Sequence, residues 1–83
     1  MLLNKWNYQT HKYDKVEIPD CYNCKTYSNN MKELVHCPHC GDEIEIGDSY
    51  TSLEYHTETG FGYAVCEPCY ELEWKRRKQF KGE

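Results

Sequence analysis

The chain has 83 residues, 10 Lys and Arg against 14 Asp and Glu, a formal net charge of −4, and six cysteines. A chain this short buries too little apolar surface for its core alone to supply much stability after conformational entropy is counted. No stretch approaches the roughly 20 apolar residues of a membrane span, and the start lacks a secretory signal. We therefore expect one small cytoplasmic domain without a membrane partner, in which thiols bind metal more often than they form disulfides.

Residues 1–20 are rich in aromatic side chains, including Trp6, Tyr8 and Tyr13. Pro19 disfavours helix for the residue before it. We expect an extended N-terminal arm or an edge strand over this range. We expect its aromatic rings to cover the flank of the following domain. The alternative is that they form a stacking platform.

Residues 21–83 are predicted to form a metal-binding domain. A short capping signal, Asn30 followed by Glu33, leaves room for one helical turn at most. Alternating polarity and the punctuating glycines Gly60 and Gly62 then predict a β-hairpin. Its strands and the strand that precedes it are expected at 42–46, 50–57 and 63–65.

A helix is predicted at about 67–80. Pro68 falls in its first turn, where the missing N–H has no cost. Acidic residues near the start and the basic run Lys75–Lys78 near the end match the helix dipole. Glu71 and Lys75 also form a pair at i,i+4 spacing in the favourable orientation.

All six cysteines fall in pairs separated by two residues, namely Cys21/Cys24, Cys37/Cys40 and Cys66/Cys69. Two such pairs supply the four tetrahedral ligands of a structural zinc ion. In the middle pair Gly41 follows the second cysteine, which suits a tight knuckle. The last pair lies at the predicted helix start, where backbone N–H groups and the dipole favour thiolates. We predict one zinc ion on Cys37, Cys40, Cys66 and Cys69.

The order of knuckle, hairpin and helix over residues 37–80 resembles the treble-clef zinc fingers, a group that includes LIM-like and GATA-like modules. The resemblance implies a small α+β domain stabilised by zinc. More loosely, the chain is similar to small uncharacterised zinc-binding proteins of bacteriophages and mobile elements. That similarity implies a bacterial host cytoplasm as the setting.

The pair Cys21 and Cys24 leaves alternatives open. These thiols are free in the interpretation that we favour. In a second interpretation they hold a second zinc ion with His36 and His39, although His39 is otherwise expected to face solvent; the other histidines are His11 and His56. In a third, Cys21 and Cys24 join Cys37 and Cys40 in a zinc ribbon, which would leave the last pair without partners.

Enzymatic activity is not expected. The string Cys37-Pro-His-Cys40 occurs in thioredoxin-like oxidants, but Gly41 and an alternating run follow here in place of the helix which that fold requires. The spacing from His56 to the last cysteine pair does not match that of the zinc deaminases. A four-cysteine zinc site also has no open position for a water molecule.

Charge is distributed unevenly along the chain. From Glu33 to Trp74, both included, there are ten acidic residues and no Lys or Arg, whereas five of the ten basic residues lie from Lys75 to Lys81. This asymmetry predicts a protein-interaction module with an acidic surface and a partner with a basic surface. The expected anchors on the hairpin are the exposed aromatic residues Tyr50, Tyr55, Phe61 and Tyr63.

Such a module could act as a phage or mobile-element regulator that inhibits a host machine. The alternative is a nucleic-acid-binding zinc finger that uses the basic helix end, Lys75–Lys81. Its contacts would come from Lys75, Arg76, Arg77 and Lys78.

Overall fold

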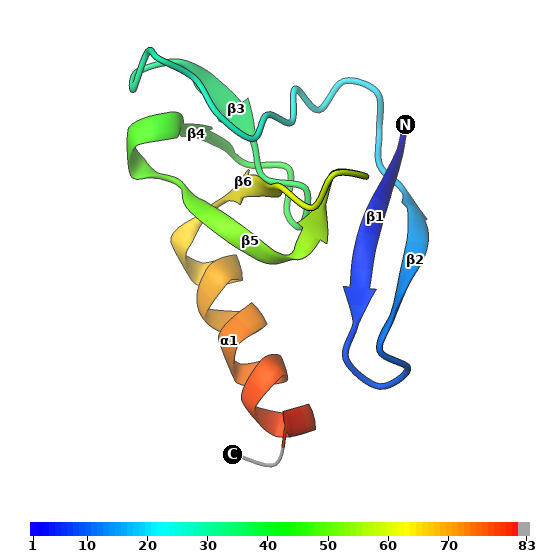
Figure 1. Ribbon diagram of the computed structural model, residues 1–83. Helices are drawn as coiled ribbons and strands as arrows, with labels where there is room; N and C mark the ends of the chain where they lie inside the picture. Colours follow the sequence, from blue (N-terminus) through cyan, green and yellow to red (C-terminus); the bar gives the residue numbers. More distant parts are fainter. Residues whose placement is uncertain (82–83) are drawn as a thin grey trace.

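The structure, a computed structural model, describes residues 1–81 and the side chains of residues 1–79. It is a small α+β arrangement of antiparallel strands with a helix at the C-terminal end (Figure 1). The elements are β1 (Leu2–Asn7), β2 (Lys12–Glu17), β3 (Leu34–His36), β4 (Glu43–Glu45), the 3₁₀ turn η1 (Ile46–Asp48), β5 (Tyr50–His56), β6 (Gly62–Val65) and α1 (Glu67–Lys81).

The strands form two sheets. One has four strands in the order β2-β1-β5-β6, and the other consists of β3 and β4. The N-terminal hairpin β1–β2 stands beside the far end of β5, as Figure 1 shows, and its register with that strand is restricted to Asn4 opposite His56 and Lys5 opposite Tyr55. Strand β5 is therefore the central element, in contact with the hairpin on one edge and with β6 on the other.

Residues 1–20, expected to form an arm or an edge strand, fold into a two-stranded hairpin. Strands β1 and β2 pair along their whole length, from Leu2 opposite Glu17 to Asn7 opposite Lys12. The turn between them contains His11 in the left-handed region, with φ of 55°, and its N–H donates to the carbonyl of Asn7 at 2.9 Å. Strand β2 forms the outer edge of the larger sheet.

A small apolar core attaches the hairpin to β5. Leu3, Ile18 and Tyr55 pack together and are each no more than 5% exposed. A hydrogen bond of 2.8 Å from the Ile18 N–H to the Met1 carbonyl closes the open end of the hairpin. Val35 on β3 and Val65 on β6 are also fully buried but do not belong to this cluster, so apolar burial is not confined to one region.

The helical turn considered near Asn30 is absent, and residues 28–33 form a turn instead. The Ser28 hydroxyl accepts the N–H of Asn30, and the Asn30 side chain accepts the N–H of Lys32, at 3.1 and 3.0 Å. Short polar side chains compete in this way with the backbone bonds that a helix needs. Glu33 continues instead into β3.

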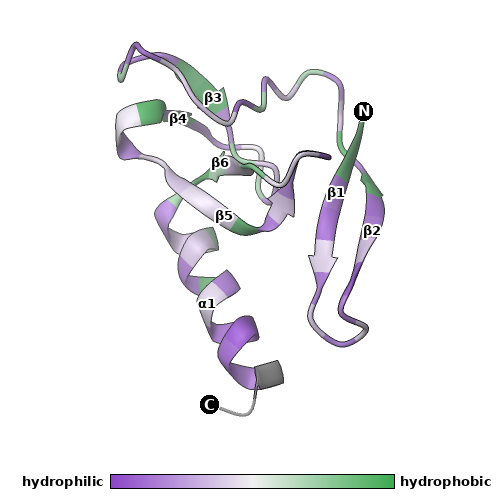
Figure 2. Cartoon of the chain, viewed as in Figure 1, coloured by the Kyte–Doolittle hydropathy of each residue, from purple (hydrophilic) through white to green (hydrophobic). Residues whose placement is uncertain are grey.

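Helix α1 begins at Glu67, where the sequence predicts it, and is hydrophilic over most of its surface (Figure 2). It packs on β5 through a polar residue, because Glu73 is fully buried. Within residues 1–81, no helix combines the length and the apolar character needed to cross a membrane.

Candidate metal centre

The first half of the site is a tight knuckle between β3 and β4. The Gly41 N–H donates to the Cys37 carbonyl at 2.7 Å, and the Cys37 N–H donates to the Asp42 carbonyl at 3.0 Å. Gly41 has φ of +76°, a conformation that side chains disfavour. The backbone N–H of Asp42 also points at the Cys40 sulfur and lowers its pKa, although burial raises it more. This turn holds the sulfurs of Cys37 and Cys40 on one side.

The second half of the site is the first turn of α1. Cys66 directly precedes the helix and Cys69 lies in its first turn, whose initial hydrogen bond runs from the Tyr70 N–H to the Cys66 carbonyl at 3.0 Å. The backbone N–H of Cys69 is a donor to the Cys66 sulfur. Unpaired N–H groups at a helix start favour negative charge. Strand β6 delivers this turn to the knuckle.

The four thiols meet although the inner two are 26 positions apart in the sequence. The sulfurs of Cys37, Cys40, Cys66 and Cys69 all lie within 4.8 Å of one another, and those of Cys40 and Cys66 are 3.6 Å apart. A tetrahedral zinc ion with bonds of about 2.3 Å places its sulfur ligands about 3.8 Å apart. The cluster could therefore hold a metal ion such as zinc. Cys37 is buried, whereas Cys40 is exposed, so the site lies at the surface.

Because the thiols lie close together, their pKa values shift in opposite directions. Burial raises the pKa of Cys40 to about 12, and burial with its thiol neighbours raises that of Cys69 as well. Burial also opposes ionisation of Cys66, but the Cys69 N–H and the neighbouring thiols outweigh it and lower the pKa of Cys66. One thiolate is thus stabilised at the expense of the others. A divalent cation removes this conflict, because it favours deprotonation of every sulfur that it binds.

Cys21 and Cys24 lie outside this cluster. The Cys24 thiol contacts the carbonyl of His36 at 3.6 Å, and burial raises its pKa, while Cys21 is exposed. Among the described residues, neither thiol belongs to a group of ligand atoms close enough to hold a metal. The structure therefore does not assemble the second zinc site or the ribbon, because it pairs Cys37 and Cys40 with the last two cysteines.

The histidines considered as ligands have other contacts. The ring of His36 stacks on Tyr22 with centroids 6.0 Å apart. His39 is in the knuckle, but its Nε2 lies 2.5 Å from a carboxylate oxygen of Glu73, and its side chain is only 14% exposed. The expectation that His39 faces solvent is therefore wrong. A buried carboxylate on α1 attracts the ring inward.

Glu73 is the centre of a network that the sequence did not reveal. Its carboxylate accepts hydrogen bonds from the Ser52 hydroxyl at 2.6 Å and from the Leu53 N–H at 2.7 Å, in addition to the contact with His39. The Ser52 oxygen in turn accepts the N–H groups of Glu54 and Tyr55, where the β5–β6 register is irregular. Burial raises the pKa of Glu73, but these bonds outweigh it and lower the pKa. The network joins the knuckle, β5 and α1.

The basic run on α1 is divided among different environments. Arg76 forms two bonds to Glu54, of 2.6 and 2.8 Å, and Glu54 is only 1% exposed. The Arg77 guanidinium lies over the ring of Trp74, 5.0 Å from its centre. Lys75 and Lys78 are exposed, and the side chain of Lys81 lies outside the described residues. The basic run Lys75–Lys78 therefore does not present one continuous basic surface.

The four expected aromatic anchors also differ in their exposure. Tyr55 is 4% exposed and belongs to the core, so the expectation that it is exposed is wrong. Tyr63 is partly buried against the same core. Tyr50 and Phe61 are exposed, at 41% and 67%, but they lie near opposite ends of the β5–β6 hairpin. Tyr55 on β5 packs against Leu3 and Ile18 of the hairpin. The alternating pattern of the strand did not show that this side of β5 is covered.

Comparison of the chain with protein-family models, with curated proteins and with solved structures gives no match. Fold and site together define a small α+β domain with a four-cysteine cluster that could hold a metal ion.

Proposed function

We propose that this chain is a non-enzymatic binding module of the treble-clef type, in which a zinc ion on four cysteines stabilises the fold and an acidic surface contacts a basic partner protein. The cluster of Cys37, Cys40, Cys66 and Cys69 is the observation that carries the proposal. It links two turns that are distant in the sequence. The order of knuckle, hairpin and helix supports the treble-clef assignment.

A structural role for the metal follows from the ligand set. Four thiolates fill the tetrahedron of a zinc ion and leave no position for water or a substrate. The site contributes folding free energy of about 10 kcal/mol or more at neutral pH when such an ion binds. The apolar core of Leu3, Ile18 and Tyr55 is small by comparison. The metal therefore supplies folding free energy that the small core does not provide.

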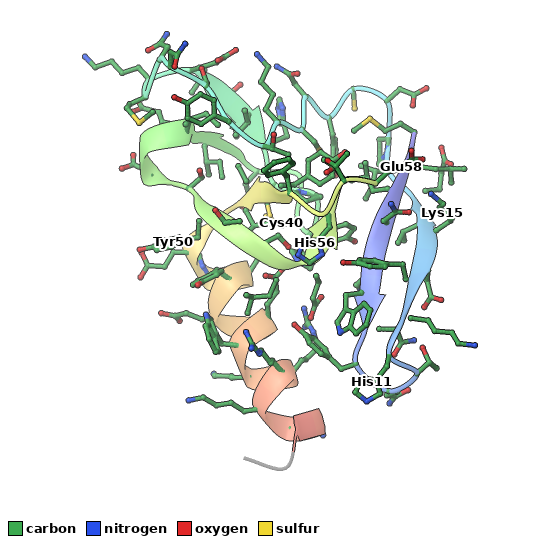
Figure 3. All side chains as sticks on the ribbon, in the orientation of Figure 1. His11, Lys15, Cys40, Tyr50, His56 and Glu58 are labelled. Carbon is green, nitrogen blue, oxygen red and sulfur yellow. The ribbon has the colours of Figure 1, made fainter. Side chains whose placement is uncertain are left out.

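The partner surface that we propose is the acidic end, defined here by the exposed carboxylates of β4, η1 and the first turns of α1. These residues are Glu43, Glu45, Asp48, Glu67 and Glu71. Tyr50 stacks on Tyr70 beside them, with centroids 4.9 Å apart, and Figure 3 shows Tyr50 at the start of β5 near the helix. Aromatic rings surrounded by charge are typical of protein interfaces.

Charge complementarity assigns the partner a basic surface. In a host cytoplasm, a small acidic module of this kind inhibits a nucleic-acid enzyme by covering its basic groove. This role rests on the charge of the acidic end. It requires no catalytic group on the chain.

Metal analysis tests the site. Purified protein with reduced thiols is expected to contain one zinc ion per chain, and the Cys21→Ser/Cys24→Ser variant is expected to contain the same amount. Cys37→Ser/Cys69→Ser is expected to bind no zinc at stoichiometric concentration. A zinc content that falls with the first variant, or is unaffected by the second, would contradict the assignment.

Binding to purified basic nucleases and polymerases tests the partner surface. Affinity is expected to fall as salt is raised, because exposed charges are screened. Glu67→Gln/Glu71→Gln and Tyr50→Ala are expected to weaken binding, whereas Phe61→Ala, at the other end of the hairpin, serves as the matched control. Binding that is insensitive to salt and to the first two variants would show that the acidic end is not the interface.

A further inference from the structure

Two adjoining cavities lie between the N-terminal hairpin and α1. Their volumes are about 270 and 400 Å³, and Trp6 and Tyr8 line both. One is closed on the helix side by Arg76 and the other by Arg77. Figure 3 shows His11 in the β1–β2 turn and His56 at the end of β5, which border the larger cavity. We call the larger cavity the aromatic groove.

The walls of the aromatic groove are mostly ring systems. Trp6 and Tyr13 are 5.0 Å apart between centroids, with their planes at 68°. The rings of Tyr13 and His56 are 5.7 Å apart between centroids, and those of His11 and Trp6 are 6.3 Å apart. Trp6 is partly exposed and Tyr13 is 50% exposed. These rings cover the flank of the domain only in part, so accessible ring surface remains.

The charge of the aromatic groove is positive. Arg77 is its cation, His11 and His56 supply polar ring edges, and no carboxylate lines it among the described side chains. In the smaller cavity, by contrast, Glu54 is paired with Arg76 and Asp14 accepts a hydrogen bond from Asn7. The groove therefore complements a ligand that combines a flat ring with a negative charge.

We propose that the aromatic groove binds single-stranded nucleic acid, with one base against Trp6 and Tyr13 and the adjoining phosphate at Arg77. Aromatic side chains beside a basic track are the usual means of holding unpaired bases, since every base has a face that can stack. A cavity of about 400 Å³ has room for one nucleotide. Exposed Lys12, next to His11, extends the positive charge along the hairpin.

This surface shares only Arg77 with the basic helix end, among the described side chains. Arg77 and Lys75 are separated by roughly 200° around a helix axis, so only Arg77 faces the aromatic groove. Arg76 is occupied by Glu54. The groove is also distinct from the acidic end, so this inference and the proposed protein partner stand or fall independently.

Fluorescence of Trp6 provides the test. In zinc-loaded protein carrying Trp74→Phe, Trp6 is the remaining tryptophan. Titration with an eight-nucleotide thymidine strand at low salt is expected to quench it to saturation, and the same strand in a duplex is expected to bind at least tenfold more weakly. Tyr13→Leu is expected to weaken single-strand binding about tenfold, which is within the range measured for loss of one stacking partner.

The matched pair Arg77→Gln and Lys75→Gln separates the groove from general attraction to the helix. Arg77→Gln is expected to reduce the slope of log affinity against log salt by about 0.7, the value for one phosphate contact on a single strand. Lys75→Gln is expected to change the slope by much less. Circular dichroism and zinc content verify that both variants are folded.

Four outcomes would overturn the proposal. They are the absence of quenching at low salt, equal effects of Arg77→Gln and Lys75→Gln, equal binding of an acidic peptide of the same charge and length, and equal affinity for thymidine monophosphate, which would make a free nucleotide the ligand. Unchanged binding in Tyr50→Ala is expected, because that residue belongs to the acidic end.

Discussion

The N-terminal hairpin β1–β2 and the segment from the knuckle to α1 differ in what fixes them to the rest of the chain. The hairpin contacts β5 through two register positions and an apolar cluster around Leu3 and Ile18. The knuckle and α1 are joined by thiols and by a buried carboxylate. Polar groups therefore join the knuckle to the helix, whereas apolar contact joins the hairpin to β5.

This difference shows how a short chain can use two kinds of cohesion. Apolar burial is non-directional and suffices to hold a local hairpin against a strand. A metal site and a hydrogen-bonded carboxylate are directional, and they define how a helix is oriented on a sheet. The hairpin has exposed aromatic rings on its surface. The segment from the knuckle to α1 has exposed charged side chains instead. The first two predictions test the polar half of this comparison, the third tests the apolar half, and the fourth tests the knuckle itself.

Metal removal is expected to have the largest effect. Chelation of reduced protein should abolish the cooperative unfolding transition, since a structural zinc ion contributes about 10 kcal/mol or more. Circular dichroism and thermal melts with and without chelator measure this. The Cys21→Ser/Cys24→Ser variant, whose altered residues lie outside the cluster, should respond in the same way. A melt unchanged by thorough chelation would show that the thiol cluster does not hold the two turns together.

Glu73→Gln is expected to cost about 3–5 kcal/mol, because it removes a buried charge that has three hydrogen-bond partners. The pKa of Glu73 is lowered from 4.5, so its ionised form stabilises the fold above that value and the contribution is lost as pH falls through the lowered pKa. The difference in stability between wild type and variant should therefore shrink in acid.

Denaturant melts at several pH values measure that difference. Glu71→Gln, an exposed site on the same helix, should change stability by less than about 0.5 kcal/mol. A gap between wild type and Glu73→Gln that stays constant down to strongly acidic pH would show that Glu73 is not ionised in the fold.

Leu3→Ala is expected to destabilise the protein by about 2–4 kcal/mol, because it leaves a cavity beside Ile18 and Tyr55. The neighbouring Leu2 is 62% exposed, so Leu2→Ala is the control and should have little effect. Both variants should retain their metal. Loss of zinc from Leu3→Ala at a temperature where it remains folded would mean that the two halves are not separately held.

Gly41→Ala is expected to have the smallest effect, about 1–3 kcal/mol. Gly41 has φ of +76°, and an added methyl group would collide with the ring of Tyr22. Gly60 has φ of +96° with no neighbour within 4 Å, so Gly60→Ala carries the conformational strain alone. The difference between the thermal melts of the two variants measures the effect of the collision. Equal effects would show that Tyr22 moves away at no cost.

Local signals in the sequence predicted a large part of the fold. The cysteine spacing and Gly41 predicted the knuckle, the alternating run predicted β5, and the charge gradient predicted the start of α1. Each depends on residues within one turn or one strand. The four thiols of the cluster were also named from spacing, and the structure brings them together.

Other features required the tertiary structure. His39 and Glu73 are 34 residues apart, and nothing in the pattern around either residue indicates the other. The burial of Glu54 and Tyr55 has the same origin, because β5 is a central strand whose two faces meet α1 and the hairpin core. An alternating pattern predicts one buried face and cannot predict that both are covered.

The sequence by itself determined the knuckle, the strands between residues 42 and 65, the helix and which thiols can share a metal, since these depend on local backbone geometry and ligand spacing. Only the tertiary structure decided which charges are buried, which rings remain exposed, and that the N-terminal hairpin faces Arg77 across a groove. Those outcomes depend on which distant surfaces meet, and burial free energy depends on the surface that is covered and not on the order of residues in the chain.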